Sequence, residues 1–225
     1  ARCAGRGMTS IAISRVHFPV TTLGPDRRLG IWMQGCSIRC KGCVSRDTWE
    51  PDPAKAMTVA SLLAWCRRTT GGVLDGVTIS GGEPFDQPAA LAALLDGLQR
   101  WRRELARPFD LLCYSGHPLK TLQRDHGDIL ARLDALIPEP YSQGRPLGGL
   151  WRGSDNQPLL PLSPLGEERY REAVAAPAAG QDKRMQVAIE AGRLWFIGIP
   201  HRGDMAALEG LCRARGLDIR SASWR

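Results

Sequence analysis

The chain has 225 residues, of which 43% are hydrophobic and 24% are charged, and its formal net charge is +7. This composition is typical of a folded globular protein with one domain or two small ones, and it excludes a disordered or fibrous chain. The apolar runs are too short to span a bilayer, and no apolar stretch follows the first arginines, so we expect neither a membrane span nor a secretory signal. Residues 1–9 are expected to be a disordered or vector-derived extension, and residues 10–225 a single domain.

The distribution of charge indicates which kinds of partner to expect, and the number and spacing of the cysteines indicate the cellular compartment. Basic residues occur as short pairs spread along the chain, which is typical of a solvated basic face. A nucleic-acid site is therefore not expected, although an acidic partner protein fits the charge. The seven cysteines are an odd number at unequal spacing, so they do not indicate a disulfide framework and favour a reducing cytoplasm. Cys66 and Cys212 fall on apolar helix faces and are expected in the core.

The apolar periodicity predicts strands that alternate with helices. In chain order the expected elements are strands 10–16 and 28–33, helix 58–68, strand 76–80, a long helix from 88, strand 110–115, helix 118–133, strand 134–137, a hairpin of 186–190 and 193–199 that turns at 191–192, and helix 204–215. Asp86 is a candidate cap for the helix that begins at Pro88. Residues 142–181 lack a clear period, apart from a turn of helix around 167–175.

Alternating strands and helices predict an α/β fold with a mostly parallel sheet and helices outside. Four or five strand–helix units are too few for a closed eightfold barrel, so we expect an open, partial βα barrel. The loops that follow residues 33, 80 and 115 leave the carboxyl ends of strands. Because ligands on such sheets bind at these ends, we expect the three loops to gather at one site.

Three thiols stand close together at the spacing C-x3-C-x2-C. The candidate metal ligands are Cys36, Cys40 and Cys43. Three ligands do not close a structural zinc site, which takes four, but they suit a [4Fe-4S] cluster whose fourth iron stays open. Zinc with His17 or His117 as the fourth ligand, and a chance clustering of buried cysteines, are alternatives that the spacing leaves open.

A second motif, GGEP, ends the apolar strand expected at 76–80. Its two glycines make a tight, exposed backbone edge beside the Glu83 carboxylate. Such an edge can hold an ammonium group through carbonyl oxygens and the carboxylate. Alone, the run is a glycine-rich turn between a strand and a helix; together with the thiol triplet it is a strong composite signal.

These two motifs resemble those of radical S-adenosylmethionine (SAM) enzymes, in which C-x3-C-x2-C is the cluster loop and GGEP the methionine-binding strand end. The runs GPDRRLGIWMQGCSIRCKGCVSRDTWE, GVTISGGEPFDQ, YSG and WRGSDNQ are similar to the small activating enzymes of anaerobic ribonucleotide reductase. The resemblance covers most of residues 10–160 and implies the partial barrel of the radical SAM type. Val44 departs from the aromatic residue that is frequent there in the activators. No cysteine-rich insert precedes Gly81, so a second cluster is not expected.

The resemblance implies two cofactors, a [4Fe-4S] cluster on the three cysteines and SAM on the open iron. Reductive cleavage of SAM would give a 5′-deoxyadenosyl radical, which abstracts a hydrogen atom, most directly from a glycine of a large glycyl-radical enzyme. An electron donor such as flavodoxin or ferredoxin is implied too. The cofactor-binding residues implied are Ser80, Gly81, Gly82, Glu83 and Ser115.

Other residues carry weaker assignments. Tyr114 would pack near the adenine or be a core tyrosine with a bonded hydroxyl. Gly198 and Pro200 would let the backbone approach the adenine. The loop with Arg152 and its neighbours resembles an activator block but has no role derived from it, and no histidine is assigned as catalytic.

Two other functions stay open at this point. One is a radical SAM enzyme that acts on a small molecule or peptide, for example by a ring contraction like that of carboxydeazaguanine synthase. The other is a non-enzymatic zinc or iron–sulfur interaction module, which predicts no SAM binding and leaves GGEP without a role.

Overall fold

The computed structural model describes residues 9–176, 185–190, 193–217 and 219–225. The extension expected at residues 1–9, apart from its last residue, and the turn expected at 191–192 lie outside the described residues. None of the described helices is both long and apolar enough to cross a membrane.

A seven-stranded open sheet forms the centre of the fold, in the order β3-β1-β2-β4-β5-β6-β7. Its strands are β1 (Ser10–Val20), β2 (Arg28–Met33), β3 (Ala56–Thr58), β4 (Gly76–Gly81), β5 (Asp110–Tyr114), β6 (Ala135–Ile137) and β7 (Leu160–Pro161). The four central strands, β2, β4, β5 and β6, are parallel, while β1, β3 and β7 pair antiparallel at the edges. Because the two edge strands β3 and β7 do not pair with each other, the expected open and mostly parallel α/β sheet is confirmed.

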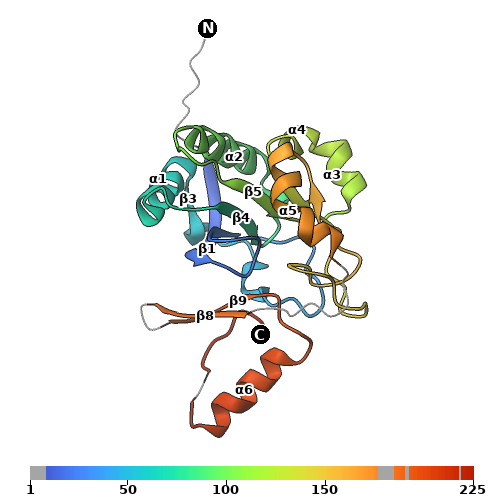
Figure 1. Ribbon diagram of the computed structural model, residues 1–225. Coiled ribbons are helices and arrows are strands. Elements are labelled where there is room, and N and C mark those ends of the chain that lie inside the picture. The colour runs from blue at the N-terminus through green and yellow to red at the C-terminus, as the bar shows by residue number, and fades with distance from the viewer. Residues whose placement is uncertain (1–8, 177–184, 191–192, 218) are drawn as a thin grey trace.

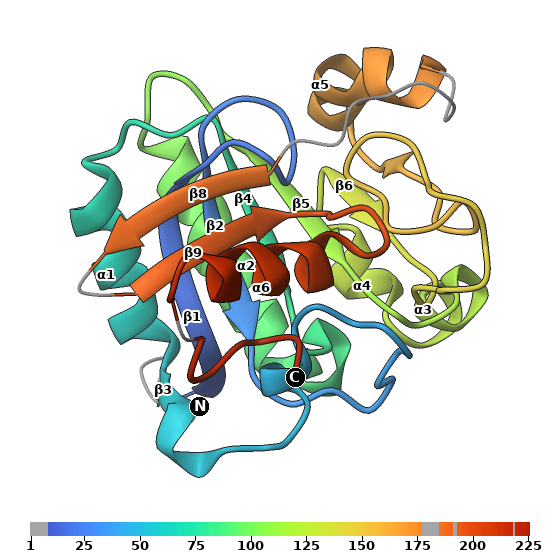
Figure 2. The same ribbon diagram turned by 90° about the horizontal axis from the view of Figure 1, so that it is seen from below.

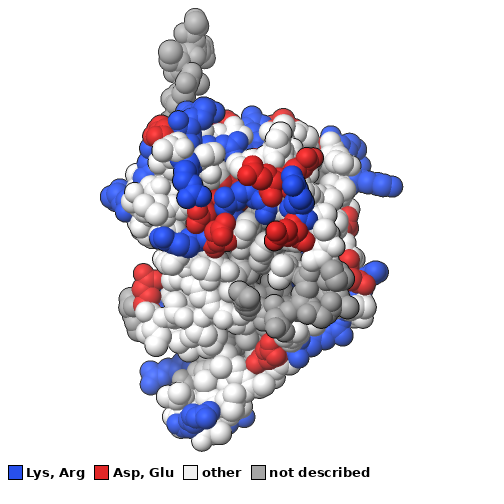
Figure 3. Space-filling view, viewed as in Figure 1, with Lys and Arg blue, Asp and Glu red and all other residues white. Residues whose placement is uncertain are grey.

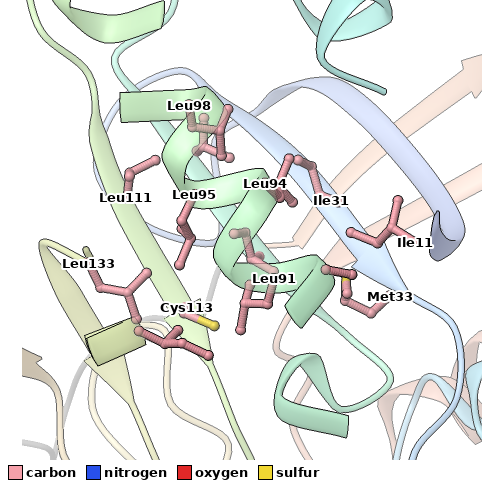
Figure 4. Packing of buried hydrophobic residues seen from close by; sticks show 14 of the residues in the cluster. Ile11, Ile31, Met33, Leu91, Leu94, Leu95, Leu98, Leu111, Cys113 and Leu133 are labelled. Atoms are coloured by element: carbon pink, nitrogen blue, oxygen red, sulfur yellow. The ribbon is translucent and has the colours of Figure 1, made fainter. Parts of the chain in front are cut away.

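Helices cover one face of this sheet (Figure 1). They are α1 (Val59–Thr70), α2 (Pro88–Arg103), α3 (Leu119–Asp125) and α4 (Gly127–Leu130), with α5 (Pro164–Ala175) at the β6 side. The leucines of α2 repeat every three or four residues, so they form one apolar stripe that points at the strands (Figure 4). Leu91, Leu94, Leu95 and Leu98 are fully buried there among residues of β1, β2 and β5. This packing is the main core of the protein.

The other face of the sheet is covered by a hairpin and the last helix (Figure 2). These are β8 (Met185–Glu190), β9 (Arg193–Gly198) and α6 (Asp204–Ala214). Ile197 of β9 is buried in a separate cluster with Val20, Leu23 and Trp32. The hairpin is also fixed by Gln186, whose Nε2 donates to the Pro19 carbonyl at 2.7 Å. On the face seen in Figure 3, basic and acidic side chains are interspersed over the sheet-and-helix half.

Three local predictions differ from the structure. The helix expected at 118–133 is divided into α3 and α4, because His126 leaves the helical backbone region with φ −137° and Gly127 begins a new turn. Asp86 does not cap α2; the cap position is Gln87, and the Asp86 carboxylate accepts hydrogen bonds from Ser37 instead. Asp86 itself ends the short 3-10 helix η3 (Pro84–Asp86). The turn of helix expected at 167–175 is a full helix, α5.

The amino ends of the parallel strands are joined by a buried charge network. Arg28, at the start of β2, is fully buried, and its Nη2 lies 2.7 Å from Oδ2 of the equally buried Asp110, at the start of β5. Arg28 Nε also donates to Thr78 Oγ1 on β4, and the Tyr170 hydroxyl of α5 donates to Asp110. This network ties three strands and a helix together at the end of the sheet opposite the predicted site.

Candidate functional site

The cysteine loop leaves the carboxyl end of β2, and its beginning is held by backbone hydrogen bonds. The Gly35 and Cys36 amides donate to the carbonyls of Thr48 and Trp49 at 2.8 and 2.9 Å, so the loop is closed at its base. Two short 3-10 helices, η1 (Arg46–Thr48) and η2 (Pro53–Lys55), follow it. Cys36, Cys40 and Cys43 are half-buried and present as free thiols.

The middle of the loop is anchored by the segment after β4. Asp86 accepts from the Ser37 amide at 2.7 Å and from the Ser37 hydroxyl at 2.8 Å. Ile38 packs so closely on Gly116 that a Cβ there would lie 2.9 Å from its side chain. The loop therefore rests on both of the neighbouring strand ends, as the parallel topology predicts.

Backbone N–H groups point at the thiols of this loop. The Ser45 amide donates to Cys43 Sγ at 3.3 Å. Amides of Arg39 and Ile38 face Cys36, and the Tyr141 amide faces Cys40; both sets act to lower the thiol pKa. Burial is the larger influence, however, and it raises the pKa of Cys36 and of Cys40 above the ordinary value. Bound iron would reverse this balance, because a metal ion favours the thiolate form, and the N–H groups directed at sulfur would add to that effect.

The GGEP turn lies directly against the start of the cysteine loop. Met33 of β2 pairs with Gly81 of β4, and the amides of Gly82 and Glu83 donate to the carbonyls of Met33 and Gly35 at 2.9 and 2.8 Å. A Cβ at Gly82 would lie 2.0 Å from the Gly35 oxygen. Glycine is required there because the two backbones approach too closely for any side chain.

The Glu83 side chain is engaged inside the protein. Glu83 is 1% exposed, and its carboxylate accepts from the Phe85 amide at 2.9 Å, the Ser115 hydroxyl at 2.9 Å and the Gly116 amide at 2.7 Å. Burial raises the pKa of Glu83, while these donors act in the opposite direction. Glu83 thus joins the loop after β4 to the loop after β5, and three of the oxygen lone-pair positions of the carboxylate are already used.

A cavity of about 790 Å³ opens beside the cysteine loop. Cys43 and Tyr114 line it, as do Gly198 and Pro200 at the end of β9, whereas Ser80, Ser115 and residues 81–83 are not part of its lining. Of the WRGSDNQ run, Gly153 and Gln157 face the cavity. The Tyr114 hydroxyl donates to the Trp151 carbonyl at 2.8 Å, and burial raises the pKa of Tyr114. Tyr114 therefore has the bonded hydroxyl expected of a core tyrosine, and it also lines the cavity.

The spacing C-x3-C-x2-C suits a [4Fe-4S] cluster, in which each thiolate binds a different iron. Across the described residues, no group of three or more His, Cys, Asp and Glu side chains is close enough to hold one metal ion. His17 and His117, the alternative fourth ligands, lie instead beside Glu190 and Asp86, at 3.4 and 3.6 Å.

Sequence reasoning missed several residues of this site. Asp86 binds Ser37 of the cysteine loop, and Tyr141 carries the amide that faces Cys40. Arg202 and Trp224 line the cavity from the far end of the chain. No periodicity or motif marks these residues, because their role depends on how distant loops fold against one another.

Comparison with known proteins identifies the family. The family model "4Fe-4S single cluster domain" matches residues 22–160. The chain belongs to this family.

Named relatives agree with the family match. An anaerobic ribonucleoside-triphosphate reductase-activating protein of Vibrio cholerae is 30% identical over 63% of this chain and 92% of the relative. The protein of that name from Enterobacteria phage T4 is 26% identical over 60% of this chain and 85% of the relative. A pyruvate formate-lyase-activating enzyme of Clostridium pasteurianum is 38% identical over 32% of each chain. With these relatives, the chain is a radical SAM enzyme whose cofactors are an iron–sulfur cluster and SAM.

Proposed function

We propose that this protein is an activating enzyme that abstracts a hydrogen atom from a glycine of a partner glycyl-radical enzyme. One observation carries the proposal: the β2–β4 pairing and the two amide hydrogen bonds to Met33 and Gly35 join the thiol loop to the GGEP turn. Radical generation needs the iron and the sulfonium nucleotide side by side, and this arrangement supports it. The relatives named for anaerobic ribonucleotide reductase and pyruvate formate-lyase support the class of partner.

In this proposal the residues divide the work of binding. Cys36, Cys40 and Cys43 hold three irons, and the amides around them stabilise the thiolates. The backbone edge at Gly81 and Gly82, with the remaining lone-pair capacity of Glu83, orients the methionine ammonium. Ser80 and Ser115 are the assigned hydroxyls at the strand ends, although Ser115 already donates to Glu83.

The rest of the cavity serves to hold the nucleotide and the substrate. When bound, the cluster supplies the electron that cleaves SAM to methionine and a 5′-deoxyadenosyl radical. Tyr114, Gly198 and Pro200 form apolar surface that fits the adenine face, and the aromatic side chains around them exclude water. Exclusion of water and of other hydrogen donors protects a reactive species until the intended hydrogen atom is reached.

The deciding experiment is anaerobic reconstitution with iron and sulfide, reduction, and addition of SAM. We expect 5′-deoxyadenosine and methionine, with deuterium transferred from an α-deuterated glycine of the partner. Replacement of all three loop cysteines by alanine should remove iron and cleavage together, while Cys66→Ala should keep both. An intact cluster that cleaves no SAM would contradict the enzyme proposal.

A small-molecule substrate is the second candidate. The cavity volume of about 790 Å³ lies in the range of small-molecule sites, which is the observation that favours it. SAM cleavage accompanied by turnover of a metabolite, without hydrogen transfer from a partner glycine, would select this function over the first.

Compartment and electron supply complete the proposal. A cytoplasmic location agrees with six free thiols among the described cysteines. A small reductant protein such as flavodoxin or ferredoxin would deliver the electron. This choice of donor is tested by adding each purified donor protein to the reconstituted enzyme and measuring reduction of the cluster through its absorbance.

A further inference from the structure

The last third of the chain lies outside the matched family. The family model ends at residue 160, and the Vibrio cholerae relative aligns over 92% of its own length with only 63% of this chain. The elements β8, β9 and α6 and the segment Ser221–Arg225 all follow residue 160. Their arrangement therefore cannot be read from the family match.

These added residues form one side of the cavity beside Cys43. The opposite side comes from the cysteine loop and the segment after it, with Val44, Arg46 and Trp49. The lining residues that the added part contributes are 198–203, 205 and 206, together with Glu209 and Trp224. We name this second group the C-terminal wall.

The segment Ser221–Arg225 connects the two sides. The Ser223 hydroxyl donates to the Val44 carbonyl at 2.8 Å, and the Asp47 amide donates to the Ser223 carbonyl at 3.1 Å. The position marked C in Figure 2 accordingly lies beside the blue segment that follows the cysteines. Asp47 is held from its other side as well, because Arg15 of β1 forms an ion pair with its carboxylate.

Trp224 anchors this segment to the C-terminal wall. Its indole Nε1 donates to Glu209 Oε1 of α6 at 2.6 Å, and its ring meets the ring of Phe196 of β9 edge-on, with centroids 6.3 Å apart. Arg225 Nε donates to the same Glu209 oxygen at 3.1 Å. The Trp224 side chain thus contacts the hairpin, the last helix and the cavity. Trp224 is also the next residue in the sequence after Ser223, which binds Val44.

We propose that Trp224 is a positioning residue that holds the C-terminal wall against the segment after Cys43. The link to SAM chemistry rests on the proposed function; the link to Cys43 rests on the contacts alone. With the wall in place, Cys43 is half-buried at a closed edge of the cavity. If the wall moves away, Val44 and Asp47 each lose their hydrogen bond to Ser223, and water enters the cavity from that side.

The first test uses the metal-free, full-length chain and measures how fast each loop cysteine is alkylated, by mass spectrometry of the peptides. In Trp224→Leu we expect the Cys43 rate to rise by roughly fivefold or more, while the Cys66 rate stays low. Glu209→Leu should give the same rise, and the double variant no further rise, because both substitutions open one contact. Glu209→Gln keeps the acceptor for the indole and should restore the wild-type rate. Exposed Arg220→Ala is the matched control.

The second test uses reconstituted protein and follows the bleaching of the cluster absorbance in air. We expect Trp224→Leu to bleach faster than Arg220→Ala at equal starting iron content. Wild-type alkylation rates in both folded leucine variants, checked by circular dichroism, would overturn the proposal. If wild type binds a cluster but cleaves no SAM, the proposed function fails, whereas the alkylation comparison still decides the role of Trp224. Should Trp224→Leu not fold, Glu209→Leu carries the same decision.

Discussion

At the scale of single residues, Glu83 acts as a structural carboxylate as well as the acidic residue of the GGEP motif. It accepts hydrogen bonds from both loops that leave β4 and β5 and is almost completely buried. A carboxylate suits this position because it offers only acceptors to three converging donors. The motif therefore specifies a fold contact in addition to the chemistry proposed for it.

Glu83→Gln should separate these roles. The amide replaces one acceptor oxygen by an NH₂ group that faces a donor, so we expect the free energy of unfolding to fall by about 1–3 kcal/mol. Urea denaturation of the metal-free chain measures the change, with exposed Glu172→Gln as the control. Unchanged stability in Glu83→Gln would show that these three hydrogen bonds contribute little to the fold.

At the scale of elements, the close approach of the backbone at Gly82 to the backbone at Gly35 determines how the cysteine loop and the GGEP turn are arranged. Gly82 meets Gly35 where β2 and β4 end, and the fit leaves no room for a Cβ. The glycine is needed for space here, because Gly82 is not among the residues with a positive φ.

Gly82→Ala should consequently displace the cysteine loop from β4. We expect iron content after reconstitution to drop severely, with a loss of stability of at least about 1–3 kcal/mol, the usual cost of overpacking. Iron analysis and thermal unfolding measure both. Gly127→Ala, at a glycine where an added Cβ would meet nothing within 4 Å, is the control and should match wild type. Full iron binding by Gly82→Ala would mean that the loop does not depend on this contact.

Sequence reasoning found most elements because their apolar residues are grouped clearly. The leucines of α2 follow the helical period, while β2, β4 and β5 are short, continuous apolar runs bounded by turn residues. It failed where tertiary contacts decide, as at His126, which divides a helix, and at Asp86, whose carboxylate binds Ser37 rather than a helix end. The path of residues 142–161 also gave no period to follow.

At the scale of the whole molecule, stability and chemistry are placed at opposite ends of the sheet. The buried Arg28–Asp110 pair lies where β2 and β5 begin, and the cysteine loop lies where β2 ends. This separation suggests that one end can be weakened without direct damage to the other. The thiols and GGEP are short motifs that the sequence shows directly. Trp224 of the C-terminal wall belongs to no motif and lies more than 100 residues beyond either of them, so its place beside the cavity could not be predicted.

Asp110→Asn tests this separation. It leaves a fully buried guanidinium without its charged partner, so we expect the free energy of unfolding to fall by about 3–5 kcal/mol. Glu104→Gln, which removes the partner of the exposed Arg67, should lower the free energy of unfolding far less, because solvent screens that pair. Under conditions where Asp110→Asn stays folded, its SAM cleavage should equal that of wild type. A selective loss of cleavage in the folded variant would show that the two ends are coupled.

The pair of peptide contacts between residues 33–35 and 82–83 has a mechanical consequence. Thermal motion that shifts the start of the cysteine loop must move the GGEP turn with it, because the two segments are joined by backbone hydrogen bonds. In the proposed function, the distance between the cluster held by the loop and the S–C5′ bond of SAM held by the turn would then stay nearly constant while the rest of the chain moves.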